Sequence, residues 1–152
     1  MTASFLTAGL TAETPARAVA SKQASRIQMH AQQHRAAKTS KRERARQRRL
    51  GRMQQTKRDA AVMVARTGWS PRHFNCLDRL WIRESGWNHR AYNRYSGAYG
   101  IPQALPGRKM RSAGRDWRTN PYTQMRWGLG YIKHRYGSPC RAWRHLRATG
   151  WY

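Results

Sequence analysis

One glutamate stands out among the residues that could do chemistry. Glu84 lies in the stretch IRESGWNHRAYNRYSGAYGIPQA, residues 82–104, where it is the only acidic residue beside three arginines and several aromatic side chains. The whole chain of 152 residues has six Asp and Glu against 31 Lys and Arg. A carboxyl group that is desolvated among aromatic side chains has a raised pKa and is suited to act as a general acid.

A helix expected over residues 71–85 would position this glutamate. Phe74, Leu77, Trp81 and Glu84 follow one another at intervals of three, four and three residues, so they share one face of that helix. The carboxyl group would lie on the apolar stripe in the last turn, where desolvation and the negative end of the helix macrodipole raise its pKa. A salt bridge with one of the neighbouring arginines is the structural alternative.

Two other carboxyl groups follow residue 69. Asp78 would point to nearly the opposite side of the same helix, which favours a surface partnership with an arginine. Asp116, in the segment GRDWRTN, is expected to be a turn or cap residue. His73 precedes Cys76 by three residues, but no further ligands follow at an accepted zinc spacing, so we expect neither a metal nor a cofactor.

Three dipeptides mark the helices that would carry these groups. Ser70-Pro71, Asn120-Pro121 and Ser138-Pro139 each place a good N-cap before a proline at the first helical position. They predict helices over residues 71–85, 121–136 and 139–149, with a glycine after each of the last two. The intervening segment, residues 86–119, is expected to form an irregular loop or short hairpin, so the fold class is mainly α.

The composition changes near residue 69. Residues 1–66 contain no Trp, Tyr or Cys, and the block KTSKRERARQRRLGR is a charge run. We expect residues 22–68 to be a basic tail, disordered or a single helix, and residues 69–152 to hold the whole packed domain. Residues 1–21 look like the end of a secretory signal, with a disordered Ala-rich N-terminus as the alternative. No apolar run approaches the roughly 18 residues that cross a bilayer.

The formal charge of +25 indicates a polyanionic partner. Charge alone does not choose between nucleic acid, a membrane surface and an anionic cell wall. A nucleic-acid-binding protein would use the Lys38–Arg58 run on phosphates and aromatic side chains for base stacking. The densest basic run lies in the expected tail whereas the aromatic residues lie in the domain, and no nucleic-acid-binding motif is present.

The residues around Glu84 resemble a known family. Glu84-Ser85-Gly86-Trp87-Asn88, followed by Gly100-Ile101-Pro102-Gln103, resembles the signature of soluble lytic transglycosylases, which have a goose-type lysozyme-like fold. In that family a Glu-Ser pair ends a helix and a Gly-Leu-Met-Gln-type motif follows, so Pro102 departs from the commoner Met. The segments WGLGYIKHRYGSPCRAW and TGWY further resemble small secreted domains of high-GC Gram-positive bacteria, related in fold to resuscitation-promoting factors.

The resemblance implies an enzyme that cleaves the β-1,4 bond between N-acetylmuramic acid and N-acetylglucosamine in peptidoglycan. Glu84 would be the single catalytic residue of a lytic transglycosylase, acting first as acid and then as base, with a 1,6-anhydro product. A muramidase-type glycoside hydrolase, which gives a hydrated product, is the alternative enzyme. The protein would be secreted or cell-wall associated, and the basic tail could bind anionic wall polymers. A non-catalytic wall-binding module of the same fold and, less favoured, a basic nucleic-acid-binding protein are the alternatives.

The resemblance also implies which residues hold the glycan. Gln103, by its match to the family's Gln, would hydrogen-bond the N-acetyl sugars, and Ser85 would hold the Glu84 loop or a substrate group. Sugar rings stack on aromatic faces, which makes Tyr99 a cleft residue and Trp87 and Tyr95 further candidates.

Cys76 and Cys140 are the only cysteines. In an exported domain a disulfide between them would stabilise the fold by about 4 kcal/mol by restricting the unfolded chain. Two free buried thiols in a cytoplasmic protein are the alternative.

Overall fold

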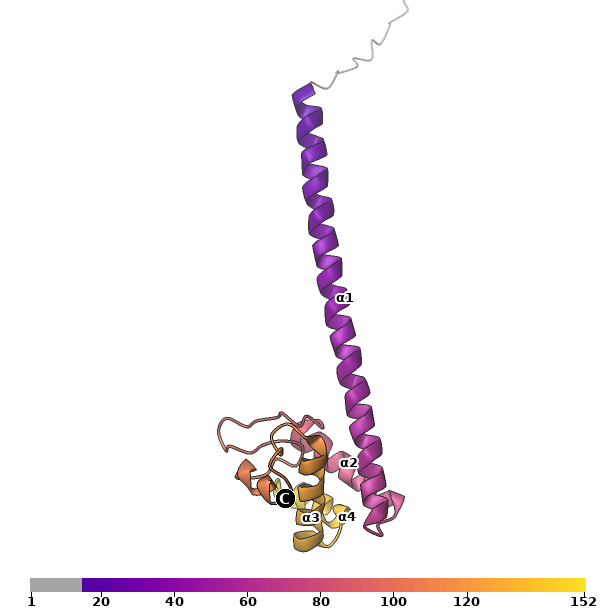
Figure 1. Ribbon diagram of the computed structural model, residues 1–152, viewed down its shortest axis with the longest axis vertical. Coiled ribbons are helices and arrows are strands. Elements are labelled where there is room, and N and C mark those ends of the chain that lie inside the picture. Colours follow the sequence, from indigo (N-terminus) through magenta and orange to yellow (C-terminus); the bar gives the residue numbers. More distant parts are fainter. Residues whose placement is uncertain (1–14) are drawn as a thin grey trace, which may run out of the picture. The chain divides into compact units, whose positions relative to one another are not determined.

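The computed structural model describes residues 15–152 (Figure 1). Over that range the chain is mainly helical, with α1 at Pro15–Arg66, α2 at Pro71–Ser85, the 3-10 helix η1 at Gly107–Ser112, α3 at Pro121–Tyr136 and α4 at Pro139–Thr149. These described residues form no strand, and isolated bridges pair Tyr92 with Tyr99 and Tyr99 with Ala104. The mainly α fold class is confirmed.

The three helices predicted from their caps have the predicted bounds. The Asn120 side chain accepts a hydrogen bond from the backbone N–H of Tyr122, and that of Ser138 accepts one from the N–H of Arg141. Ser70 makes no such bond and instead contacts Nδ1 of His73 at 3.1 Å. A left-handed glycine follows each of the three helices, which is the conformation that ends a helix without steric cost to the residue.

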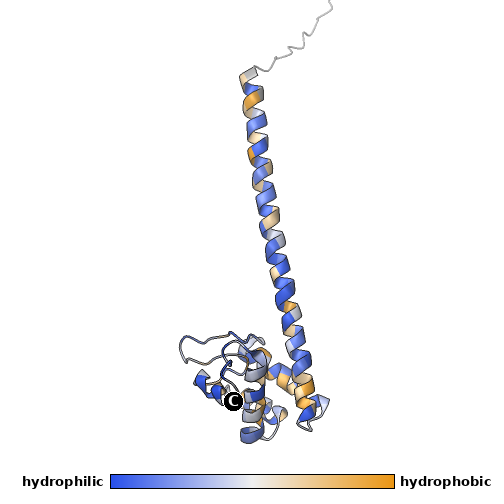
Figure 2. Cartoon of the chain, viewed as in Figure 1, coloured by the Kyte–Doolittle hydropathy of each residue, from blue (hydrophilic) through white to orange (hydrophobic). Residues whose placement is uncertain are grey.

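The tail expected over residues 22–68 lies almost entirely within one helix, α1, but this helix is divided between two parts of the molecule. The chain divides into two compact units, residues 1–47 and residues 48–152, and α1 contributes to both. In the first unit the described side chains of α1 are exposed, and Figure 2 shows that hydrophilic residues predominate there. A helix that is polar all round has no face to bury against a core.

The packed domain begins earlier than residue 69, which corrects the expected boundary. Ala60 and Val64 are fully buried, and Met53 and Met63 pack against the same core. These four residues recur at intervals that place them on one side of a helix. Their small or flexible side chains are scattered among cations, so the composition of this segment hides its role in the core.

The main core lies between α2, α3 and α4. It contains Leu77, Leu80 and Trp81 from α2, Met125, Leu129 and Ile132 from α3, and Ala142 and Leu146 from α4. A second cluster, Ala104, Met110 and Trp117, fills the irregular segment between α2 and α3. This segment therefore has its own apolar support beside the end of α2.

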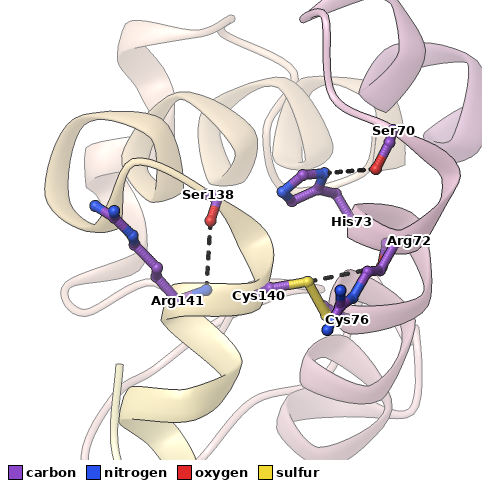
Figure 3. Close-up of a disulfide and its surroundings, with 7 residues drawn as sticks. All are labelled: Ser70, Arg72, His73, Cys76, Ser138, Cys140 and Arg141. Atoms are coloured by element: carbon purple, nitrogen blue, oxygen red, sulfur yellow. Dashed lines mark hydrogen bonds between the residues drawn. A yellow bond between two sulfur atoms is a disulfide. The ribbon is translucent and has the colours of Figure 1, made fainter.

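A disulfide joins α2 to α4 near the start of each helix (Figure 3). Cys76 and Cys140 are bonded, with their Cα atoms 4.9 Å apart, and no free cysteine occurs in residues 15–152. The expected pairing is present. It fixes the first half of α2, while Glu84 lies at the other end of the same helix.

Candidate active site

Glu84 lies in the last turn of α2, one residue before the helix ends. Leu77 and Trp81, on the same face, are fully buried, and Phe74 packs against the core. Within residues 15–152 the Glu84 carboxyl group forms neither a hydrogen bond nor an ion pair, so the salt-bridge alternative does not hold. Burial raises the pKa of Glu84, and the nearby Arg83 guanidinium opposes part of that rise.

Ser85 ties the end of α2 to the loop that carries the second motif. Its hydroxyl donates to the carbonyl oxygen of Ile101 at 2.9 Å and to that of Trp81 at 3.3 Å. Both acceptors are backbone atoms, so the hydroxyl holds the Gly100–Gln103 turn against the helix that bears Glu84.

Gln124 holds the same turn from α3. Its side chain is fully buried, and its Oε1 accepts a hydrogen bond from the Ile101 N–H at 2.9 Å. Its Nε2 donates to the carbonyl oxygens of His89 and Trp117 at 2.9 and 2.7 Å. A Cβ on Gly100 would lie 2.5 Å from Oε1, which explains the glycine there. Sequence reasoning missed Gln124, although a glutamine among the apolar residues of an expected helix was a usable signal.

Tyr152 brings a hydroxyl group close to Glu84 and was also missed. Its Oη accepts a hydrogen bond from Nε1 of Trp81 at 3.1 Å and donates to the carbonyl oxygen of Pro102 at 2.9 Å. Burial raises the pKa of Tyr152 well above its ordinary value, and the negative charge of Glu84 raises it further. The phenol therefore stays protonated and joins α2 to the second-motif loop beside the carboxyl group.

The loop residues expected to bind glycan lie in different environments. Nε2 of Gln103 donates to the carbonyl oxygens of Gly100 at 2.9 Å and Ala91 at 3.4 Å, whereas its Oε1 accepts no hydrogen bond in the described part of the chain. Tyr99 donates its hydroxyl proton to the Arg118 carbonyl, and its ring packs against the second cluster. Tyr95 is fully exposed.

Trp87 differs from its expected role in the cleft. Only 4% of its surface is exposed, and its ring packs edge-on against Trp81 in the main core, so no ring face is open to a sugar. Its Nε1 donates to Oδ1 of Asp78 at 2.8 Å. The same oxygen pairs with Nζ of Lys57 at 2.7 Å, so the ionic partner of Asp78 is a lysine of α1 and not an arginine.

Asp116 braces the start of α3. Its carboxylate accepts hydrogen bonds from Nδ2 of Asn120 at 2.6 Å and from Oγ1 of Thr123 at 2.7 Å. The bond from Asn120 lowers the pKa of Asp116 most, followed by the bond from Thr123. A carboxylate held ionised in this way cannot supply a proton near neutral pH, so Asp116 has the turn role expected of it.

Aromatic rings continue from Tyr152 along α3. The Tyr131 ring lies 6.1 Å from that of Tyr152 and stacks nearly parallel to Trp127 at 5.3 Å. Trp127 in turn packs against the second cluster. These rings border a hollow of about 360 Å³, lined by Ser112, Ala113, Arg126, Trp127, Gly130, Tyr131 and His134. Sequence reasoning did not assign Trp127 or Tyr131 to a site.

Residues 15–152 also bear on metal binding and on membrane insertion. That range holds no group of three or more His, Cys, Asp or Glu side chains arranged to bind a metal ion. Nor does it contain a helix with the length and apolar content required to span a bilayer.

Comparison with known proteins gives one match. The family model of the transglycosylase SLT domain matches residues 74–148, from the first turn of α2 to the last turn of α4. A search of curated proteins and of solved structures gives no match to this chain. The matched range contains Glu84, Ser85 and Gln103, and it supports a transglycosylase type of enzyme whose substrate is peptidoglycan. Residues 74–148 thus form a transglycosylase SLT domain, with the mainly helical, lysozyme-like architecture of that family.

Proposed function

We propose that this protein cleaves the β-1,4 bond between N-acetylmuramic acid and N-acetylglucosamine with Glu84 as its single catalytic residue. The observation that carries the proposal is the state of this carboxyl group: it is partly buried, it has no partner in residues 15–152, and its pKa is raised by burial. Asp78 and Asp116, by contrast, are each held by two neighbouring groups. Of these three carboxyl groups, Glu84 alone is free to exchange a proton with a substrate.

The first half of the reaction uses protonated Glu84 as an acid. Its proton passes to the glycosidic oxygen while the bond from that oxygen to C1 of the muramyl residue breaks. The acetamido oxygen of the same sugar bonds to C1 as the bond breaks, so no second protein carboxylate is needed. The N-acetylglucosamine end leaves as an alcohol, and Glu84 is left ionised.

The second half uses ionised Glu84 as a base. It takes the proton of the muramyl 6-hydroxyl, whose oxygen then bonds to C1 and displaces the acetamido oxygen. The product is a 1,6-anhydro sugar, and Glu84 regains the proton that it lost. Transfer of a hydroxyl proton to a carboxylate is favoured by the same burial that raises the pKa of Glu84.

The surrounding contacts would hold the glycan. Oε1 of Gln103 is free to accept from an acetamido N–H, because only Nε2 is used by the loop. The rings of Tyr131 and Trp127 lead from Tyr152 to the neighbouring hollow and offer apolar surface to sugar rings. Ser85 and Gln124 position the loop and touch no substrate in this proposal.

The proposed place of action is outside the cytoplasm, at or in the cell wall. A disulfide persists in an oxidising compartment, which favours an exported protein. The exposed basic stretch of α1, residues 15–47, would hold the enzyme near anionic wall polymers by screened attraction.

Mass spectrometry of muropeptides released from purified walls tests the proposal. The wild-type protein should release fragments that end in 1,6-anhydromuramic acid, and Glu84→Gln should release them at least about a hundredfold more slowly. Fragments with hydrated reducing ends would show that the protein hydrolyses the bond and does not form the 1,6-anhydro product. No fragments at all, together with retained binding to walls, would favour the non-catalytic wall-binding module.

A further inference from the structure

A second hollow shares Arg126 and Gly130 with the hollow bordered by Trp127 and Tyr131. It has a volume of about 330 Å³, which is within the range of small-ligand sites. The end of α1 and the middle of α3 line it, through Met63, Arg66, Thr67, Arg126, Leu129, Gly130 and Lys133. All of these residues belong to the compact unit of residues 48–152. We call it the α1/α3 hollow.

The lining of the α1/α3 hollow combines positive charge with apolar surface. Arg66, Arg126 and Lys133 are its only charged residues, and among the described residues that line it none is acidic. Arg126 is held in place, because its Nη2 donates to the Ala113 carbonyl at 2.6 Å. Met63 and Leu129 supply apolar side chains between the cations. This combination fits a ligand that carries carboxylates and small apolar groups together.

Gly130 leaves the backbone of α3 uncovered at the hollow. Glycine inside a helix lowers stability relative to alanine. At Gly128, two residues earlier, packing excludes a side chain, because a Cβ there would lie 2.9 Å from the Trp81 ring. A Cβ on Gly130 would meet nothing within 4 Å, so no part of the protein requires a glycine there. The open space there lets a ligand approach the helix backbone closely.

We propose that the α1/α3 hollow binds a short acidic peptide with small apolar side chains, the chemical class of peptidoglycan stem peptides. The proposal rests on the proposed function for the biological source of that peptide. Because this hollow and the aromatic hollow share Arg126 and Gly130, a peptide that branches from a glycan lying along Tyr131 and Trp127 would reach it. Polyol-phosphate chains are also anionic, but they fit the hollow less well because they lack the methyl groups that its apolar lining would contact.

Binding of a sugar-free peptide tests this site without involving cleavage. The probe is N-acetylated L-Ala–γ-D-Glu–L-Lys–D-Ala, titrated by calorimetry against the full chain, with the same peptide amidated at its carboxyl groups as the control. The wild-type protein should bind the acid form more tightly than the amide form. Glu84→Gln should bind the acid form as well as the wild-type protein does, so this proposal and the cleavage proposal can fail separately.

Two sets of variants locate the binding. Arg126→Gln combined with Lys133→Gln should weaken binding by about tenfold, because two of the three positive charges at the hollow are lost. Arg144→Gln combined with Arg147→Gln, two exposed arginines of α4 that do not line the hollow, removes the same charge as a control and should leave binding unchanged. If both double variants lose the same affinity for the peptide, the loss comes from the lower net charge of the protein, and the α1/α3 hollow is not the binding site.

The glycine gives a control that separates stability from binding. Gly130→Leu should weaken peptide binding by about tenfold by filling the hollow, while the melting temperature stays the same or rises. Gly51→Leu is the matched variant, since Gly51 is also an exposed helical glycine with nothing within 4 Å of its Cβ and lies outside the hollow. It should not change binding. Unchanged peptide binding in Gly130→Leu would overturn the proposal. So would a result in which the substitutions at the hollow weaken binding of poly(glycerol phosphate) but leave binding of the peptide unchanged.

Discussion

The two ends of α2 have different tasks. In its first half, the disulfide of Cys76 joins α2 to α4, and at its midpoint Asp78 pairs with Lys57 and accepts a hydrogen bond from Trp87. At its end, Glu84 has no partner in residues 15–152, and its burial raises its pKa. Asp78 and Glu84 are six residues apart in one rigid helix, so their different environments arise from what packs against each face.

The difference shows how a partnered carboxylate and a reactive one can be told apart. A carboxylate with a cation and an N–H donor is stabilised in its ionised form. A carboxyl group that is partly desolvated without such partners exchanges its proton at higher pH. The anchors at Cys76 and Asp78 therefore serve to hold the end of the helix, and with it Glu84, against the loop fixed by Ser85, Gln124 and Tyr152.

The largest expected effect is on the anchored end. Cys76→Ser combined with Cys140→Ser should lower the free energy of unfolding by about 4 kcal/mol, because the unfolded chain regains the freedom that the bridge removes. Urea unfolding of the variant and of the reduced wild-type protein should give the same loss. At temperatures where the variant remains folded, glycan cleavage should change little. An unchanged unfolding midpoint would show that the bridge does not hold α2.

The next effect belongs to the other end. Glu84→Gln keeps the shape of the side chain but removes the proton, so the rate of glycan cleavage should fall by at least about a hundredfold. Asp78→Asn and Asp116→Asn, assayed on the same soluble glycan, should each cost far less, because both carboxylates are held by structural partners. A larger loss of rate in Asp78→Asn than in Glu84→Gln would reverse the two roles.

The Asp78 contacts should matter to folding. Asp78→Asn leaves Lys57 partly buried without a counter-charge, so the free energy of unfolding should fall by about 1–3 kcal/mol in a urea titration. Adding Lys57→Met to Asp78→Asn removes the unpaired charge and should recover part of the loss. If the double variant is less stable than the sum of the single changes predicts, the pair is not the source of the effect.

A smaller effect concerns the pH dependence of stability. The pKa of Glu84 is higher in the folded protein than in the unfolded chain, so protonation of this group favours folding. That contribution is complete below the unfolded pKa, about 4.3, and is lost as the pH rises through the folded pKa. The glutamine of Glu84→Gln does not titrate. The melting temperature of this variant should therefore be slightly higher than that of the wild-type protein at neutral pH and equal to it near pH 4. A difference independent of pH would contradict the raised pKa.

The parts of this fold that sequence predicts are those with local signals. The bounds of α2, α3 and α4 follow from a Ser or Asn before a proline and a glycine at the end, and each signal acts within one turn of helix. The position of Glu84 on the apolar face of α2 follows from the helical period. Such features depend on the chain within about four residues.

The parts that sequence does not predict depend on distant contacts. Nothing near Tyr152 indicates that its hydroxyl lies between Trp81 and Pro102, and nothing near Trp87 indicates that its ring is buried in the core. Lys57 belongs to a segment with the composition of a tail, yet it pairs with Asp78. The SLT resemblance identifies the motif residues but not which of their atoms remain free to bind a substrate.

The smallest expected effect on the domain comes from removing the first compact unit. Deleting residues 1–47 takes away exposed basic helix but none of the buried residues Ala60 and Val64, so the free energy of unfolding and the turnover of short soluble glycans should not change. Binding to intact walls in a sedimentation assay should weaken, and added salt should weaken binding of the full chain in the same way, because exposed charges are screened. Deleting residues 1–66 is the informative contrast, since it removes Lys57, Ala60 and Val64 and should unfold or strongly destabilise the domain. Equal wall binding by the full chain and the protein lacking residues 1–47 at low salt would show that the basic helix does not anchor the enzyme.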